Sequence, residues 1–167
     1  AAFLARAVAR EPGSIDILAT GPLGNLRAAA EIDPDFFKNT ARIACMGGVR
    51  MPLHIGWRDL SELNLSCDPE GAHAVLHAPC PVTLMDAHVC LQAPLRWGDI
   101  PRMPRWLRGR VRRWLLGFGL YSGVREFYLW DLLPAVWLGH PGLFEDRRVS
   151  VHSCVQDLQT GQLRLTA

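Results

Sequence analysis

Apolar and polar residues alternate in blocks along the first half of the chain, and these blocks predict strands and helices in turn. Residues 15–19 form a short β-rich run, and residues 23–31 repeat apolar side chains at helical spacing. The pair Asp33-Pro34 places a capping residue before a Pro and predicts a short helix through Phe37. Residues 43–46 predict a buried strand that ends at Gly47-Gly48. The first part of the chain therefore reads as βα units.

The pattern continues through the middle of the chain after an irregular stretch. Residues 49–66 contain Pro52, Gly56 and Trp57 without clear periodicity, which predicts a long functional loop. Asp68-Pro69 predicts a helix to about His77, and residues 81–85 predict another buried strand. Strands that alternate with helices in this way indicate a parallel sheet with helices on both faces.

Beyond residue 91 the composition changes. Residues 92–119 are rich in Arg, Trp, Pro and Leu, and residues 127–138 predict an apolar helix with a kink at Pro134. Residues 149–155 alternate as a strand, and Thr160-Gly161 predicts the turn of a hairpin that returns through residues 163–165. We therefore predict one α/β domain over residues 1–167, with a Rossmann-like, open, mostly parallel sheet and a C-terminal β-hairpin.

Composition narrows the class of protein further. The chain has 167 residues, is 49% hydrophobic and 20% charged, and carries a net charge of +2, as expected of a globular domain. No apolar run approaches the ~20 residues of a membrane span. The five cysteines are scattered without a Cys-x-x-Cys pair, which predicts buried free thiols and a cytoplasmic location. Because the chain begins at Ala1 without Met or a leader, we interpret it as cut or processed.

Three short motifs occur in an order that is typical of one family. They are Thr20-Gly21-Pro22-Leu23, then Glu62-Leu63-Asn64 followed by Asp68-Pro69-Glu70, and finally Trp130-Asp131. The chain resembles the later part of the inosine-uridine-preferring nucleoside hydrolase family over residues 10–90 and 127–167. The resemblance implies hydrolysis of the N-glycosidic bond of ribonucleosides, giving ribose and a free base, by water bound to calcium. It implies an incomplete fold, because the family's opening Asp-rich signature is absent.

The resemblance also implies roles for particular residues. Thr20 would lend its backbone carbonyl to calcium, Asp131 would be a second calcium ligand, and Glu62 and Asn64 would bind the ribose hydroxyls. An acid and an amide suit a diol, and i, i+2 spacing turns both side chains to one side of an extended segment. We expect Glu62→Ala in a complete version to weaken binding and turnover with little loss of fold.

Each assignment has a plainer alternative. Thr20 can simply belong to a tight strand-to-helix turn, and Glu62 with Asn64 can be an exposed loop pair. Asp131 can cap the helix that follows it, and that role is compatible with binding metal. Asp131 and one carbonyl supply fewer than the 6 to 8 oxygens that calcium takes, so we predict weak or no calcium binding by this chain.

The sequence departs from the family at three places. Trp130 stands where the family has a His beside the leaving base; an indole cannot donate a proton there, although it could stack on the base. Leu63 replaces an aromatic residue, and Gly56 falls near a loop Asn of the family. The catalytic base is unknown and would belong to the absent Asp-rich segment.

Two further patterns suggest other chemistry. His73 and His77, with Cys80 beyond, have zinc-like spacing, but no fourth ligand is in register. Residues 102–114 interleave Arg with Trp, as in a membrane-surface or nucleic-acid contact. We favour a surface helix whose Trp rings cover the sheet or wall the base pocket.

The sequence therefore predicts a nucleoside N-ribohydrolase that is inactive or weak as this isolated chain. The alternative is a non-catalytic pseudoenzyme or binding module of the same fold. The expected partner is a ribonucleoside, neither a nucleic acid nor a membrane, and a homo-oligomer is allowed.

Overall fold

Three parallel strands form the centre of the fold. The computed structural model describes residues 1–166, and its main sheet has the order β1-β2-β5, with β1 at Asp16–Ala19, β2 at Arg42–Met46 and β5 at Val82–Met85. Ile17 pairs with Ile43, and Ile43 pairs with Val82. All three strands were predicted within a residue of these bounds. The α/β class and the parallel sheet are confirmed.

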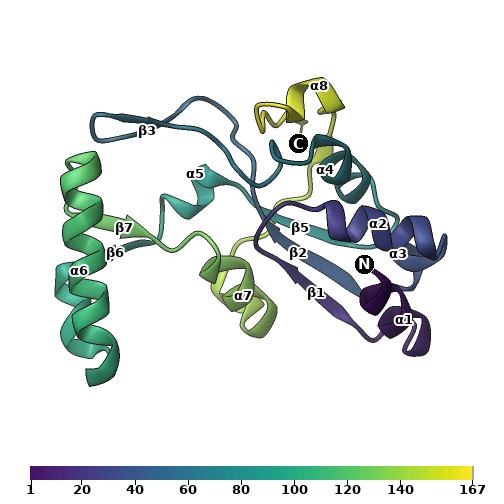
Figure 1. Ribbon diagram of the computed structural model, residues 1–167, viewed down its shortest axis with the longest axis horizontal. Helices are drawn as coiled ribbons and strands as arrows, with labels where there is room; N and C mark the ends of the chain where they lie inside the picture. Colours follow the sequence, from purple (N-terminus) through teal and green to yellow (C-terminus); the bar gives the residue numbers. More distant parts are fainter. Residues whose placement is uncertain (167) are drawn as a thin grey trace.

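Helices cover both faces of this sheet (Figure 1). One side carries α1 (Ala2–Arg10), α2 (Gly24–Ile32), α3 (Phe36–Asn39) and α4 (Pro69–Leu76), and the other side carries α7 (Leu132–Gly139), which packs on all three strands. The start of α4 follows from its sequence, because the Asp68 carboxylate accepts a hydrogen bond from the Gly71 N–H (2.9 Å) and Pro69 opens the helix.

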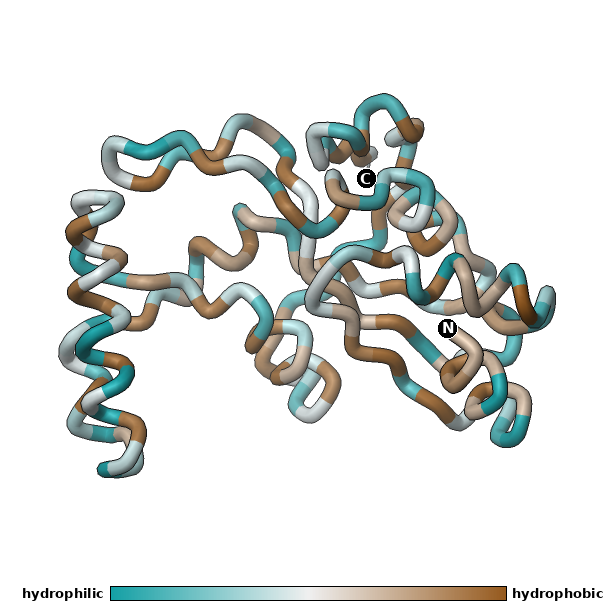
Figure 2. The backbone as a smooth tube through the Cα atoms, viewed as in Figure 1, coloured by the Kyte–Doolittle hydropathy of each residue, from teal (hydrophilic) through white to brown (hydrophobic). Residues whose placement is uncertain are grey.

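Apolar side chains bury on each side of the strands. Phe36, Leu23 and Leu158 belong to a core between the sheet and α1 to α4, and Trp137 of α7 belongs to a second core with Met46 and Met85. Figure 2 shows hydrophobic residues concentrated along β1 and β2. We call this part of the molecule, with the main sheet and the helices named so far, the body.

A second part of the chain extends away from the body (Figure 1). It consists of a hairpin of β3 (Leu53–Ile55) and β4 (Arg58–Leu60), a ribbon of β6 (Pro94–Arg96) and β7 (Glu126–Tyr128), the 3-10 helix η1 (Trp97–Arg102) and the long α6 (Arg105–Ser122). We call this part the arm. The short α5 (Ala87–Cys90) connects β5 to it.

The arm corrects two predictions. Residues 49–66 are not a plain loop, because Leu53 and Ile55 bury their side chains and pair their strand with β4. Residues 126–128 are strand rather than helix, since they pair with β6. The helix begins only at Leu132, which places Pro134 in its first turn, where no N–H is required. A kink at Pro134 is therefore unnecessary.

The C-terminal hairpin is present with a longer connection than predicted. β8 (Ser150–Val151) pairs antiparallel with β9 (Leu165–Thr166). The chain between them contains α8 (Val155–Leu158), so a tight turn at Thr160-Gly161 does not join the strands directly, and the strand predicted over 149–155 is short. A single turn, η2 (Pro141–Leu143), follows α7.

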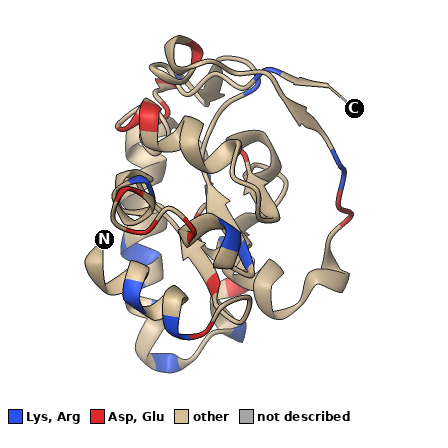
Figure 3. Ribbon diagram, turned by 90° about the vertical axis from the view of Figure 1, so that its right-hand side faces the viewer, with Lys and Arg blue, Asp and Glu red and all other residues tan. Residues whose placement is uncertain are grey.

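The basic segment 102–114 lies mostly on α6, a surface helix as expected. Its tryptophans do not cover the main sheet: Trp106 is 70% exposed, and Trp114 packs edge-on against Phe127 of β7 at 5.3 Å between ring centroids. Elsewhere the charges are mixed, and Figure 3 shows both signs scattered over the side of the body that it presents. Arg27 of α2, for example, pairs with Glu31 and Glu70.

All five cysteines are free. Cys45, Cys80 and Cys90 are buried as predicted, whereas Cys67 and Cys154 are exposed and correct that expectation. Among residues 1–166, no helix combines the length and the apolar character needed to cross a bilayer.

Candidate active site

The carboxyl ends of the main strands meet at one edge of the sheet. Thr20 directly follows β1, Gly47 follows β2 and Asp86 follows β5, and the strands are parallel and in register. In open α/β sheets this edge is where ligands bind. The bend at Thr20, part of the first sequence motif, therefore lies on the edge of the sheet where ligands bind in this class of fold.

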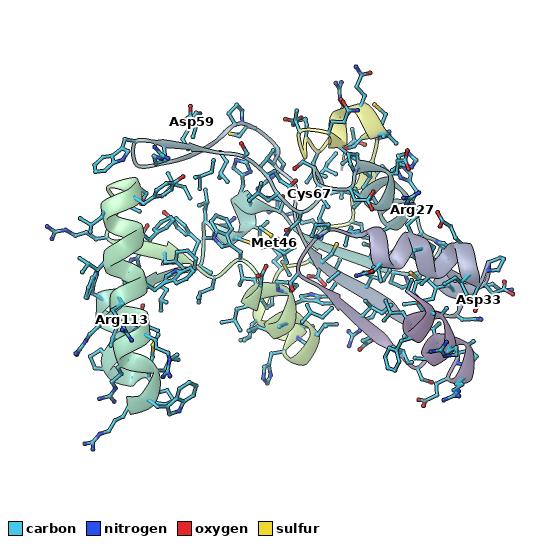
Figure 4. All side chains as sticks on the ribbon, viewed as in Figure 1. Arg27, Asp33, Met46, Asp59, Cys67 and Arg113 are labelled. Carbon is cyan, nitrogen blue, oxygen red and sulfur yellow. The ribbon has the colours of Figure 1, made fainter. Side chains whose placement is uncertain are left out.

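Asn64 is held at this edge by the end of β2. Its Nδ2 donates to the Met46 carbonyl at 2.9 Å and lies 3.1 Å from the Met46 Sδ. Met46 is the last residue of β2 and lies near the middle of the molecule, between body and arm (Figure 4). The contact places the half-buried Asn64 beside the strand ends, on the predicted ribose-binding edge.

The carboxylate of Glu62 is hydrogen-bonded to backbone N–H groups. Its side chain is 9% exposed, and its carboxylate accepts four backbone hydrogen bonds. The donors are the N–H groups of Gly48 (3.1 Å), Asn64 (2.8 Å), Leu65 (3.0 Å) and Ser66 (2.8 Å). Glu62 therefore ties the turn after it to the end of β2. It is not part of an exposed loop pair, and its removal with little loss of fold is no longer expected, because four backbone N–H groups in buried or part-buried bonds would lose their acceptor.

Two glycines make room for this arrangement. Gly48 has φ +84°, and a Cβ there would lie 2.5 Å from Leu163; Gly161 has φ +70°, and a Cβ there would lie 2.5 Å from the Glu62 side chain. Any other residue would be strained at both places. The Gly47-Gly48 pair thus does more than end a strand, since it allows the backbone to approach Glu62.

Asp131 occupies the cap position of α7, but its side chain makes no capping hydrogen bond. Partial burial raises the pKa of its carboxyl above the usual value. Burial also raises the pKa of the nearby Cys90 thiol to about 12, with smaller contributions from the negative charges of Asp86 and Asp131. Cys90 therefore lies close enough to both carboxylates, Asp86 after β5 and Asp131 at the start of α7, for their charges to act on its thiol.

Trp130 lies next to Asp131 and faces the second core. Its ring is tilted against Tyr128 at 5.5 Å between centroids and packs on buried residues of that core. Its carbonyl lies 3.8 Å from the Cys90 Sγ, which donates to it. Trp130, which stands where the family has a histidine, thus contacts Cys90 of α5.

The donors for a metal ion are few. No group of three or more His, Cys, Asp or Glu side chains gathers in the part of the chain that the structure describes. Asp131 and a Thr20 carbonyl alone do not match the 6 to 8 oxygens that calcium takes. The residues present do not by themselves fit a calcium ion. His73 and His77 stack at 4.2 Å between ring centroids, and His77 Nδ1 contacts the His73 carbonyl rather than facing a shared ligand position.

A polar network that no sequence motif indicated lies beside the site. The Asp86 carboxylate is buried, accepts from the N–H groups of His88 (2.8 Å) and Val89 (3.0 Å), and pairs with Arg50 Nε at 2.9 Å. His88 Nδ1 in turn accepts from the Arg50 N–H at 3.4 Å. The available signal was an Asp placed directly after the predicted strand 81–85, which is both a helix cap and an edge position.

Comparisons with known proteins point to one family. The family model "Inosine-uridine preferring nucleoside hydrolase" matches residues 1–166. Uridine nucleosidase 1 of Arabidopsis thaliana is 32% identical over 169 residues, which cover 96% of this chain and 50% of that protein. Pyrimidine-specific ribonucleoside hydrolase RihA of Salmonella arizonae is 30% identical over 101 residues, covering 60% of this chain and 32% of that protein.

Solved structures show the same fold. A plant nucleoside hydrolase, PpNRh1, superposes with a TM-score of 0.84 at 24% identity and covers 98% of this chain and 54% of that one. An inosine-uridine preferring nucleoside hydrolase of Bacillus anthracis gives 0.73 at 22% identity, covering 99% and 56%.

The fold is that of solved nucleoside hydrolases, an α/β fold built on a parallel sheet. The chain belongs to the inosine-uridine preferring nucleoside hydrolase family, as the resemblance predicted. It spans about a third to a half of the length of the curated relatives compared above.

Proposed function

We propose that the complete protein carrying this chain hydrolyses the N-glycosidic bond of ribonucleosides to ribose and a free base, and that this chain contributes the ribose-binding edge. The observation that carries the proposal is the fixed position of Asn64 against the end of β2, on the edge that holds Thr20. In the same proposal Asp131, whose carboxylate makes no capping hydrogen bond, and the partly buried Trp130 would contribute a carboxylate and an aromatic ring from the start of α7. Family membership and the names of the relatives support this substrate class.

In this proposal Asn64 is a direct ribose contact, whereas Glu62 acts mainly by holding the turn that presents Asn64. The carboxylate of Glu62 already accepts four hydrogen bonds, so its capacity for a sugar hydroxyl is small. The amide of Asn64 uses its Nδ2 on Met46 and keeps its Oδ1 for a hydroxyl donor.

A binding module without catalysis is the second candidate. Trp130 cannot protonate a leaving base, and residues 1–166 gather no cluster of carboxylates. Cytoplasmic location and a homo-oligomer stay predictions.

Ribose release from inosine and uridine, with and without added calcium, tests the proposal. It is measured on the 167-residue chain and on the longest native reading frame that encodes it. We expect release by the longer form, and about a tenfold loss of kcat/KM in Asn64→Ala through the lost hydrogen bond. Asn39→Ala, at the far end of α3, is the matched control. Tight inosine binding without release by the longer form would favour the binding module, and neither binding nor release would reject both.

A further inference from the structure

Departure of the base is the step for which this site lacks an obvious group. Hydrolysis breaks the bond between C1′ and the base nitrogen, whose electron pair passes to the base, and forms a bond between C1′ and the oxygen of water. A purine or pyrimidine leaves more easily when a hydrogen-bond donor stabilises the charge that develops on it. Trp130 carries an indole N–H that cannot be given up as a proton.

His88 is placed to supply such a donor. Among the six histidines, it is the one on the short helix that directly follows a strand of the main sheet. The other five lie on the β3–β4 hairpin, on α4 or directly after it, after α7 and after β8, and are His54, His73, His77, His140 and His152. The side chain of His88 is 15% exposed, so it is largely screened from bulk water but still reachable.

Hydrogen bonds connect His88 to the predicted ribose contacts. The Ala87 N–H donates to the Gly48 carbonyl at 2.9 Å, and the Gly48 N–H donates to Glu62. The next link is Arg50, whose N–H reaches His88 Nδ1 and whose guanidinium pairs with Asp86. The start of α5 and the turn that presents Asn64 are therefore both fixed to Gly48, and α5 is fixed to Arg50 as well.

The same helix contacts the residue at the start of α7. Cys90, two residues after His88, donates its thiol to the Trp130 carbonyl. The short helix that carries His88 therefore contacts Trp130, at the position where the family has its base-activating histidine.

The contact at Nδ1 decides which nitrogen of His88 carries hydrogen. Because Nδ1 accepts the Arg50 N–H, the neutral ring carries its hydrogen on Nε2. Asp86 is the nearest carboxylate, 3.9 Å from Nδ1, and its charge is shared with Arg50. Nε2 is thus the ring nitrogen left to donate a hydrogen bond to a ligand.

We infer that His88, held by Arg50 and Asp86, donates a hydrogen bond from Nε2 to the departing base and takes over the part that Trp130 cannot play. This inference rests on the proposed function. The base receives the electron pair from C1′, is stabilised by the Nε2 hydrogen bond and takes a proton from solvent, and the attacking water releases a proton to solvent.

Substrates with different leaving groups test the assignment. In the longest native reading frame, His88→Ala should lower kcat for inosine and uridine about 100-fold, the usual loss for one such donor. It should leave p-nitrophenyl β-D-ribofuranoside nearly unaffected, because p-nitrophenolate is stable as an anion. His88→Gln, which keeps an N–H donor, should recover part of the activity on inosine. His140→Ala, at an exposed position after α7, is the matched control.

Each other result is decisive. Equal losses on all three substrates would make His88 a structural residue and overturn the inference, as would unchanged inosine hydrolysis in His88→Ala. Retained p-nitrophenyl riboside cleavage shows that the variant is folded. If the unsubstituted protein releases ribose from none of the substrates, the proposed function itself fails, and the inference fails with it.

Discussion

The body and the arm keep their apolar side chains in different places. In the body, strands covered on both faces leave residues such as Phe36 and Ile43 fully buried. In the arm, Leu115 and Ile100 are buried, but most large apolar side chains of α6, η1 and the hairpin tip are exposed, namely Trp57, Trp97, Trp106, Trp114, Leu116, Leu120 and Tyr121. Part of them line a groove of about 490 Å³ between α6 and the hairpin tip. We therefore expect the buried side chains of the body to provide most of the free energy of unfolding, whereas the arm is held by a few buried side chains such as Leu115 and Ile100.

The largest expected effect is in the body. Phe36→Ala removes a fully buried ring from the main core and should lower the free energy of unfolding by about 3–5 kcal/mol. Trp106→Ala removes a larger but exposed ring of the arm and should change it by less than about 0.5 kcal/mol. Urea denaturation of both variants measures the contrast. Similar losses in the two would show that α6 is as firmly packed as the body.

An intermediate effect is expected at the junction of the two parts. Glu62→Ala leaves four backbone N–H groups without their acceptor and should cost about 3 kcal/mol. Glu62→Gln keeps one acceptor oxygen and should cost less. Thermal unfolding followed by circular dichroism compares them, and a stable Glu62→Ala protein with lost ribose binding would restore the direct sugar contact that the resemblance implied.

The smallest expected effect is confined to the arm. The Trp57 indole donates to the Tyr121 carbonyl at 3.0 Å, and the Trp57 N–H donates to the Ser122 carbonyl at 3.1 Å, so the hairpin tip is attached to the end of α6. Trp57→Ala should cost about 1 kcal/mol and act locally. Hydrogen exchange should speed up for β3 and β4 and stay unchanged for β1, β2 and β5. Faster exchange across the main sheet would contradict the separation of body and arm.

The elements of the body were predicted from the sequence better than those of the arm. Body elements carry strong local signals, such as the Asp68-Pro69 cap and the buried run 43–46, and these were predicted correctly. Strand β7 was assigned to a helix because its apolar run continues into α7, and only pairing with β6, about 30 residues earlier, makes it a strand.

The candidate site divides in a similar way. Thr20, Asn64 and Asp131 were found by motif, and the parallel sheet explains why the first two share an edge. Three of the four donors to Glu62 follow it by two to four residues, but the bond from Gly48 to Glu62 and the bond from Arg50 to His88 join residues distant in sequence and depend on tertiary folding. Pattern reasoning has no local signal for such bonds.

Within residues 1–166, strand β1 has a hydrogen-bonded neighbour on one side only, and Leu18 in it is 43% exposed. The backbone amides and carbonyls along its outer side are a template for a further strand. The 167-residue chain should therefore self-associate at high concentration through this side. A longer chain that laid a strand there would suppress the association and extend the ligand-binding edge past Thr20.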